Sequence, residues 1–205
     1  MLRDDRLKHS WEVQIKPFLL SRYLITRELY ALVAGENPYT LADPNKPVDS
    51  VTWMDAIEFC NKLSGISALT PCYILDNEHE IIFNPESNGY RLPVEAEWEY
   101  ACKAGTTGHR YGKIDEIAWY KENSGGHSHE VGTLKPNDWG IYDMLGNVWE
   151  WCNDIYDERV YGSYRIIRGG GWNDEERGIL ATNRRRSHPL SFKIDDLGFR
   201  VARSA

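Results

Sequence analysis

The segment Asp143–Trp151, with the sequence Asp-Met-Leu-Gly-Asn-Val-Trp-Glu-Trp, decides the fold of this chain. Trp149 and Trp151 flank Glu150, and this alternation predicts a half-buried strand with both indoles on one side. Asn147 precedes the strand, where its side-chain amide can hold a turn. The segment therefore predicts a strand that an ordered turn leads into.

Two later segments extend this pattern. Arg168–Trp172 reads Arg-Gly-Gly-Gly-Trp, and Leu197–Val201 reads Leu-Gly-Phe-Arg-Val. The three glycines permit close backbone approach or positive φ just before a tryptophan that we expect in the core. The C-terminal half is thus predicted to consist of short strands and ordered loops held together by aromatic packing.

The composition limits the number of domains and the classes of partner that we expect. The 205 residues are enough for one domain, 1–205, that buries roughly 70% of its unfolded surface. The net charge of −7 disfavours nucleic acid and anionic membranes as partners. The four cysteines have no CxxC spacing, Met1–Ser10 is charged, and no apolar run approaches the about 20 residues of a membrane span. We expect a cytoplasmic chain with reduced thiols.

The rest of the chain shows helix signals first and strand signals later, so the predicted class is α+β. Helices are predicted where apolar spacing and capping residues agree, and loops where Pro, Gly, Asn and Ser gather. The predicted elements are a strand and turn within 13–30, helices after Thr26 to Ala34, over 54–63 and over 94–104, a hairpin over 73–83, loops over 37–47 and 106–138, and strands over 140–142, 148–152, 165–168 and 198–203.

Ordered motifs along nearly the whole chain resemble the sulfatase-modifying-factor family, which includes the formylglycine-generating enzyme. They are Pro17-Phe18 with Ile25-Thr26, Pro47–Trp53, Arg91–Ala101, Asn137–Trp151, Arg168–Trp172 and Gly198–Arg200. The resemblance implies a C-type-lectin-like fold with little regular secondary structure.

The same resemblance argues against formylglycine-generating activity. The family's enzyme oxidises a substrate cysteine with copper held by two thiolates, five residues apart, shortly after the glycine-rich segment. Asp174 and Ile179 stand at these positions, and no cysteine follows Cys152. Neither residue supplies the soft ligand that Cu(I) prefers, so no copper is expected.

Two other enzymatic branches of the family keep an alternative open, because neither needs that cysteine pair. One uses iron with histidine ligands, which come largely from a partner helical domain, and the other oxidises tyrosine units of siderophores. His127 and His129 form the local histidine pair that could meet a metal if they lay on a strand, although a loop with solvated histidines is the simpler interpretation.

The resemblance also implies a structural calcium site. Asp143 and Glu150 would offer carboxylates, and Gly146 and Val148 would offer backbone carbonyls. Such all-oxygen ligation suits a hard cation. Alternatively, the two carboxylates accept backbone hydrogen bonds and hold no metal.

The ligand-facing surface of the family is the final loop, here Trp172–Asp196. We predict a non-catalytic module that binds a protein or peptide there, and the alternative is an iron- or copper-dependent oxidoreductase with a noncysteine site. The candidate pocket residues, chosen by position, are Trp172, Asn173, Asp174, Glu175, Arg184 and Arg186. The run Arg184–Arg186 is also expected to form structural pairs with nearby acids rather than a phosphate site.

Overall fold

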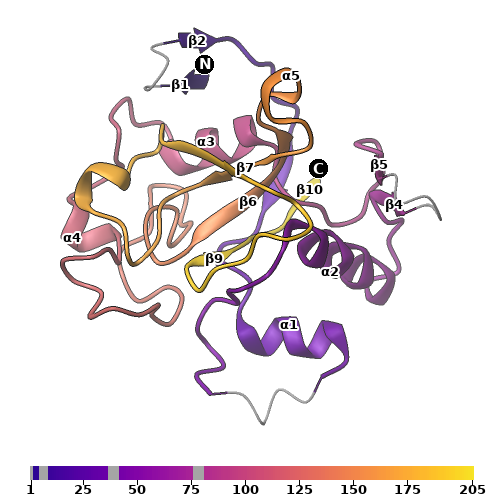
Figure 1. Ribbon diagram of the computed structural model, residues 1–205, viewed down its shortest axis with the longest axis horizontal. Helices are drawn as coiled ribbons and strands as arrows, with labels where there is room; N and C mark the ends of the chain where they lie inside the picture. Colours follow the sequence, from indigo (N-terminus) through magenta and orange to yellow (C-terminus); the bar gives the residue numbers. More distant parts are fainter. Residues whose placement is uncertain (1, 5–8, 37–41, 76–80) are drawn as a thin grey trace.

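A four-stranded sheet with the order β8-β7-β6-β9 lies at the centre of the computed structural model, which describes residues 2–4, 9–36, 42–75 and 81–205 (Figure 1). The strand β7 pairs antiparallel with both β6 and β8, whereas β9 runs parallel to β6. The strands are β6 (Trp149–Ile155), β7 (Arg165–Arg168), β8 (Arg184–Ser187) and β9 (Leu197–Gly198).

Three two-stranded sheets complete the β structure. The first is β1 (Leu2–Asp4) with β2 (His9–Trp11), and the second is β4 (Tyr73–Leu75) with β5 (Ile81–Phe83). The third pairs β3 (Phe18–Leu20) with β10 (Ala202–Ser204), so segments near the two ends of the chain lie side by side. The predicted hairpin strands are confirmed, and the residues that join them lie outside the described part.

The helices begin and end largely at their predicted caps. α1 (Arg27–Ala34) follows Thr26, whose hydroxyl accepts from the Leu29 amide, and Gly35 ends it in the left-handed region. The other helices are α2 (Trp53–Ile66), α3 (Glu95–Lys103), α4 (Ile114–Ile117) and α5 (Glu158–Tyr161), with a 3₁₀ turn over Glu176–Gly178. None of the helices in the described residues combines the length and the apolar composition that crossing a membrane requires.

The strand β6 is buried on both faces, which corrects the prediction of a half-buried strand. Trp149 and Trp151 lie in one hydrophobic cluster with α2, and Cys152 lies in a second cluster with α3. Glu150 is fully buried because Arg200 pairs with its carboxylate at 2.7 Å. A charge at a core position is tolerated here because a buried partner neutralises it.

Two further expectations need correction. Residues 140–142 form part of a turn rather than a strand, because the side chain of Asn137 accepts hydrogen bonds from the amides of Trp139 and Ile141. The strand predicted over 198–203 is divided into β9 and β10, which join different sheets. Residues 106–138 are mostly loop, as predicted, and contain the short helix α4.

Candidate functional site

Asp174 lies at the centre of the final loop and connects it to the sheet. Its Oδ2 accepts hydrogen bonds from Nε1 of Trp149, at 2.6 Å, and from the Gly171 amide, at 2.9 Å. Its Oδ1 lies 3.1 Å from Nη2 of Arg185 on β8, and that guanidinium stacks 4.6 Å from the Trp149 ring. The carboxylate therefore fixes an indole, a loop and an arginine in one arrangement.

Asp196 brings a second carboxylate to this arrangement. Burial raises its pKa to about 6, and the negative charges of Asp174 and Asp195 add to that effect. Its Oδ1 is buried without a hydrogen-bond partner among the described residues. A Cβ at Gly171 would stand 2.7 Å from its Oδ2, so glycine is needed for this close approach. A buried acceptor of this kind is ordinarily satisfied by an ordered water.

The other predicted residues of the loop surround this centre. Trp172 is half-buried, which corrects the expectation that it lies in the core, and its Nε1 donates to the Asp195 carbonyl at 3.1 Å. Asn173 is exposed. Glu175 is also exposed and lies 2.9 Å from Arg177 and 3.8 Å from Lys121. These residues form a polar rim with an aromatic side chain, and this surface carries both signs of charge.

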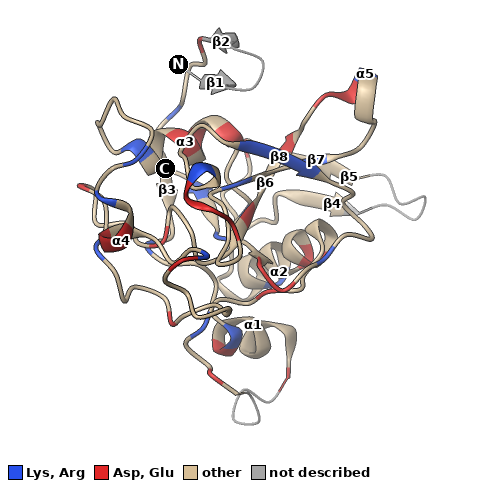
Figure 2. Ribbon diagram, turned by 60° about the vertical axis from the view of Figure 1, so that its left-hand side comes forward, with Lys and Arg blue, Asp and Glu red and all other residues tan. Residues whose placement is uncertain are grey.

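Arg184 and Arg186 do not join this site, although the sequence placed them there. β8 contains three consecutive arginines and is the blue strand in Figure 2. Successive side chains of a strand point to opposite faces, so the first and third arginines lie on one face and the second on the other. Arg184 donates to both carboxylate oxygens of Glu95 on α3, at 2.5 and 2.8 Å. Arg186 stacks 3.6 Å from the ring centre of Tyr161. The predicted structural pairing is thus confirmed for Arg184.

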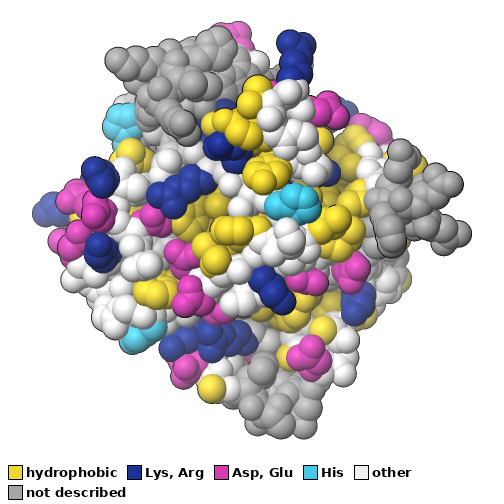
Figure 3. Space-filling view, viewed as in Figure 1, with side chains coloured by type: hydrophobic (Ala, Val, Ile, Leu, Met, Phe, Trp, Pro, Cys, Tyr) yellow, Lys and Arg dark blue, Asp and Glu magenta, His cyan; other side chains and the backbone are white. Residues whose placement is uncertain are grey.

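Arg185 is the site residue that the sequence reasoning missed. The signal was available, because a strand through 184–187 must point Arg185 away from both of its neighbours. The face of the molecule seen in Figure 3 shows acidic, basic and hydrophobic side chains interspersed rather than one region of a single charge.

The final loop contains no cysteine that could supply a thiolate. Ile179 is fully buried and packs on Gly170, where an added Cβ would lie 2.5 Å from its Cδ1. All four cysteines of the chain are buried elsewhere, and burial raises the pKa of each thiol. A buried neutral thiol is neither a good nucleophile nor a metal ligand.

The four residues of the calcium prediction lie together at the start of β6. Asp143 is buried and accepts from the Gly132 amide at 2.7 Å, and burial raises its pKa to about 6. Both oxygens of Glu150 accept from Arg200, at 2.7 and 2.9 Å. Each carboxylate oxygen has a second lone pair, so the carboxylates fit calcium only if Arg200 shares Glu150 with it. Calcium at Asp143, Gly146, Val148 and Glu150 stays a prediction.

The histidine pair lies in a loop, as the simpler interpretation predicted. The rings of His127 and His129 are 4.6 Å apart. His129 stacks on Trp119 at 3.8 Å, and its Nε2 lies 2.7 Å from the Ser124 carbonyl oxygen. Across the described residues, no three His, Cys, Asp or Glu side chains form a group that could hold a metal.

Comparisons with known proteins identify relatives over almost the whole chain. Residues 4–205 match the family model described as Sulfatase-modifying factor enzyme 1-like domain. The chain is 34% identical to the Chaperone protein LppX of Paenibacillus barcinonensis, over 94% of this chain and 82% of that protein. It is also 34% identical to the Inactive C-alpha-formylglycine-generating enzyme 2 of Mus musculus, over 57% of this chain and 44% of that protein.

A solved structure shows the same architecture. The variable protein 1 of Treponema denticola superposes with a TM-score of 0.81 at 32% identity, covering 92% of this chain and 84% of that one. The C-type-lectin-like fold and the α+β class are thereby confirmed. This chain belongs to the family of sulfatase-modifying factor enzyme 1-like domains.

Proposed function

We propose that this chain is a non-catalytic binding module whose final loop recognises a protein or peptide. One observation carries the proposal: Asp174, at the position of a catalytic cysteine in the family's enzyme, is bound to Trp149, Gly171 and Arg185. The loop is thus held by a carboxylate network instead of presenting a pair of thiolates. A rigid surface of this kind favours recognition because little side-chain freedom is lost on binding.

The chemistry of the surface favours a polypeptide ligand. Trp172 offers indole surface, and aromatic and arginine side chains are enriched at the centres of protein interfaces. Arg185 keeps a side chain that is 54% exposed. Such a surface can bind backbone and charged side chains together.

Two relatives support this proposal by their names. The mouse relative is named an inactive formylglycine-generating enzyme, so the family contains members without that activity. LppX is named a chaperone protein, and the chain spans 82% of it. A chaperone acts on another protein, and we extend that partner class to this chain.

A peptide selection with counter-selection tests the proposal. A displayed library of random peptides is first depleted on the Arg185→Glu variant and is then selected on the wild-type chain. We expect a sequence family to be enriched, because peptides that need Arg185 survive the depletion step. Depletion on Lys62→Glu is the matched control, since it reverses one exposed charge on α2, away from the loop.

The two depletion arms decide the outcome. If the proposal holds, depletion on Lys62→Glu removes the enriched family, because that variant still binds it. If depletion on Arg185→Glu also removes every binder, the final loop is not the recognition surface and the proposal fails.

The alternative is a metal-dependent oxidoreductase that uses Asp174 or the histidine pair His127 and His129, whose ring centres are 4.6 Å apart. Its test is the retention of stoichiometric iron or copper by the purified chain and its loss on His127→Ala. An unchanged metal content in that variant would exclude this pair as the site.

A further inference from the structure

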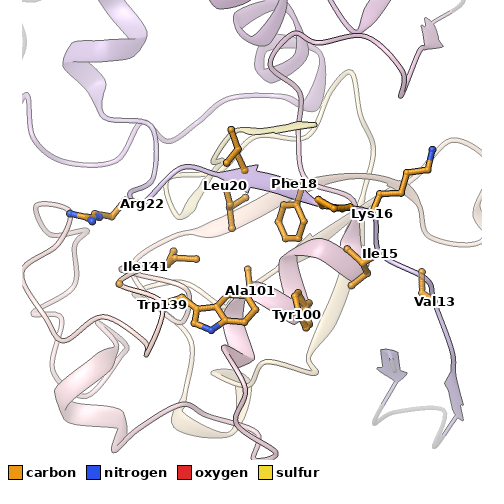
Figure 4. A pocket seen from close by; sticks show the side chains of 13 residues that line it. Val13, Ile15, Lys16, Phe18, Leu20, Arg22, Tyr100, Ala101, Trp139 and Ile141 are labelled. Carbon is orange, nitrogen blue, oxygen red and sulfur yellow. The ribbon is translucent and has the colours of Figure 1, made fainter. Parts of the chain in front are cut away.

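A cavity of about 800 Å³, lined mostly by apolar residues, lies between β3 and the turn that follows Asn137, far along the chain from the final loop. Phe18 and Leu20 point into it from β3, and Tyr100, Trp139 and Ile141 face them from α3 and the turn (Figure 4). Tyr100 is 52% exposed and Trp139 is 46% exposed, so much of their aromatic surface contacts solvent. Neighbouring aromatic side chains that are exposed together in a cavity are typical of a binding site.

The far wall of this cavity is held in place by hydrogen bonds. Nδ2 of Asn137 donates to the Ala101 carbonyl at 2.7 Å, and its Oδ1 accepts from the amides of Trp139, at 3.0 Å, and Ile141, at 3.1 Å. Asn137 thereby fastens the turn to the end of α3. The Trp139 ring packs edge-on against Tyr100 with a centroid distance of 4.9 Å. The wall is therefore formed before any ligand arrives.

The near wall is the strand β3, and its hydrogen-bonding pattern leaves one edge open. The Ser21 amide donates to the Val201 carbonyl at 2.9 Å, and the Ala205 amide donates to the Pro17 carbonyl at 3.3 Å. In an antiparallel pair, hydrogen-bonded positions alternate with non-bonded ones. Residues 17, 19 and 21 therefore face β10, while residues 18 and 20 turn their amides and carbonyls to the other side.

That other side has no strand among the residues that the structure describes. β3 pairs with β10 alone, and no backbone hydrogen bond joins Phe18 or Leu20 to another described segment. β10 is occupied on its own far side, where Ala202 exchanges two hydrogen bonds with Arg91. An open strand edge beside an apolar cavity is a template for pairing with another segment.

The charged side chains that line the cavity favour acidic residues at the ends of a bound segment. Its lining contains Lys16 and Arg22 and no acidic side chain. Arg22 is exposed and forms no ion pair with a described residue. Lys16 meets Glu86 at 3.0 Å, but both side chains are more than 70% exposed, so that pair is readily exchanged. The cavity therefore suits carboxylates next to an apolar stretch.

We propose that an extended segment of a partner protein adds as a strand to the open edge of β3. Its apolar side chains, at alternate positions, fill the cavity between Phe18 and Trp139, and an acidic residue pairs with Arg22. Main-chain hydrogen bonds to residues 18 and 20 supply affinity, and the alternate side chains supply specificity. This surface is separate from the final loop and does not depend on its function.

Peptide backbone chemistry tests the proposal. The probe is a fluorescein-labelled hexapeptide, Glu-Val-Phe-Val-Leu-Glu with a C-terminal amide, and binding is measured by fluorescence anisotropy. Two further versions carry N-methyl groups on alternate amides, one version on the odd positions and one on the even positions. A strand presents successive amides to opposite edges. One methylated version is therefore expected to lose at least tenfold in affinity, and the other to stay within about threefold, by this geometry.

Variants of the chain locate the binding. Trp139→Ala and Tyr100→Ala, both at exposed positions, are expected to weaken the probe at least fivefold, by loss of apolar contact. Ile66→Ala is the matched control, since Ile66 is 69% exposed on α2 and away from the cavity. Arg22→Glu is expected to reverse the preference from the probe to a version with lysine at both ends.

Several results would overturn the proposal. Equal losses for the two methylated versions would exclude strand addition. Binding that the variants at Trp139 and Arg22 leave unchanged would place the probe elsewhere. A chain that elutes as a dimer, and that Trp139→Ala converts to a monomer, would show that a second copy covers this edge instead of a partner. Arg185→Glu is expected to leave probe binding unchanged, which separates this surface from the final loop.

Discussion

Arg184 and Arg185 are neighbours on β8, and replacing each by alanine is expected to lower stability by different amounts. Arg184→Ala removes a side chain that is 9% exposed and donates to both oxygens of Glu95. Breaking a buried pair from one side costs about 3–5 kcal/mol, because the remaining charge loses its partner. Glu95 retains Arg168 at 3.5 Å, which favours the lower end of that range.

Arg185→Ala removes a side chain that is 54% exposed and pairs with Asp174. A pair with such an exposed partner contributes about 0–1 kcal/mol. The Asp174 side chain is only 12% exposed, but it keeps its hydrogen bonds from Trp149 and Gly171 after the change. For a chain of this size, 1 kcal/mol shifts the melting temperature by roughly 2–4 °C. We therefore expect Arg184→Ala to lower it by roughly 6–12 °C and Arg185→Ala by at most about 4 °C.

The assay is urea unfolding followed by tryptophan fluorescence, with thermal melts as a second measurement. Only Arg185→Ala is expected to weaken peptides selected on the final loop. Equal destabilisation by the two changes would refute the alternation of side chains along β8. A stable Arg184→Ala variant would refute the buried pair with Glu95.

Three other outcomes follow from the structure. The pKa of Asp196 is raised from 3.8 to about 6, so the folded state binds the carboxyl proton more tightly than the unfolded state does. The stability that this group contributes is therefore present below about pH 4 and is lost as the pH rises to about 6. Asp196→Asn is therefore expected to remove up to about 3 kcal/mol of that decline in urea titrations from pH 4 to 7, and an unchanged pH profile would contradict the shift. If calcium binds at Asp143 and Glu150, a chelator lowers the melting temperature of the wild type and leaves that of Asp143→Ala unaffected. Identical melting temperatures of the wild type with and without the chelator would exclude the site. Gly198→Ala places a Cβ 2.2 Å from the Val48 carbonyl oxygen, and we expect a loss of about 1–3 kcal/mol because backbone must move; a neutral result in urea would show that the two segments can separate without cost.

Much of the local structure could be predicted because the signals lie within a few residues of one another. Thr26 and Gly35 bound α1, and the capping box of Thr52 and Asp55 starts α2. The alternation around Glu150 identified β6. In each case the hydrogen bonds that form the element connect residues close in the chain, so the sequence alone carries the information.

The parts that could not be predicted depend on contacts between distant segments. Arg200 neutralises Glu150 across fifty positions, and this pair allows a strand with a charge to be buried on both faces. Asn137 holds the turn over 138–141 on α3, so a short apolar stretch there does not form a strand. Such pairings are set by the tertiary fold, and local patterns do not reveal them.

The candidate site shows the same division. Asp174 and Trp172 were chosen from the family resemblance, and both lie in the final loop, where Asp174 connects Trp149 and Gly171. Arg184 and Arg186 were chosen instead of Arg185 by position alone, without applying the alternation of a strand, which turns Arg185 away from both neighbours. The open edge of β3 depends on the register with β10, which the sequence does not state.

The central claim is that the final loop binds a polypeptide through the network around Asp174 and Arg185. Titration calorimetry of a loop-selected peptide against the wild type and Arg185→Ala tests it most directly. The expected result is at least a tenfold loss of affinity, equivalent to about 1.4 kcal/mol, with the melting temperature nearly unchanged. Equal affinity for the two proteins would contradict the claim.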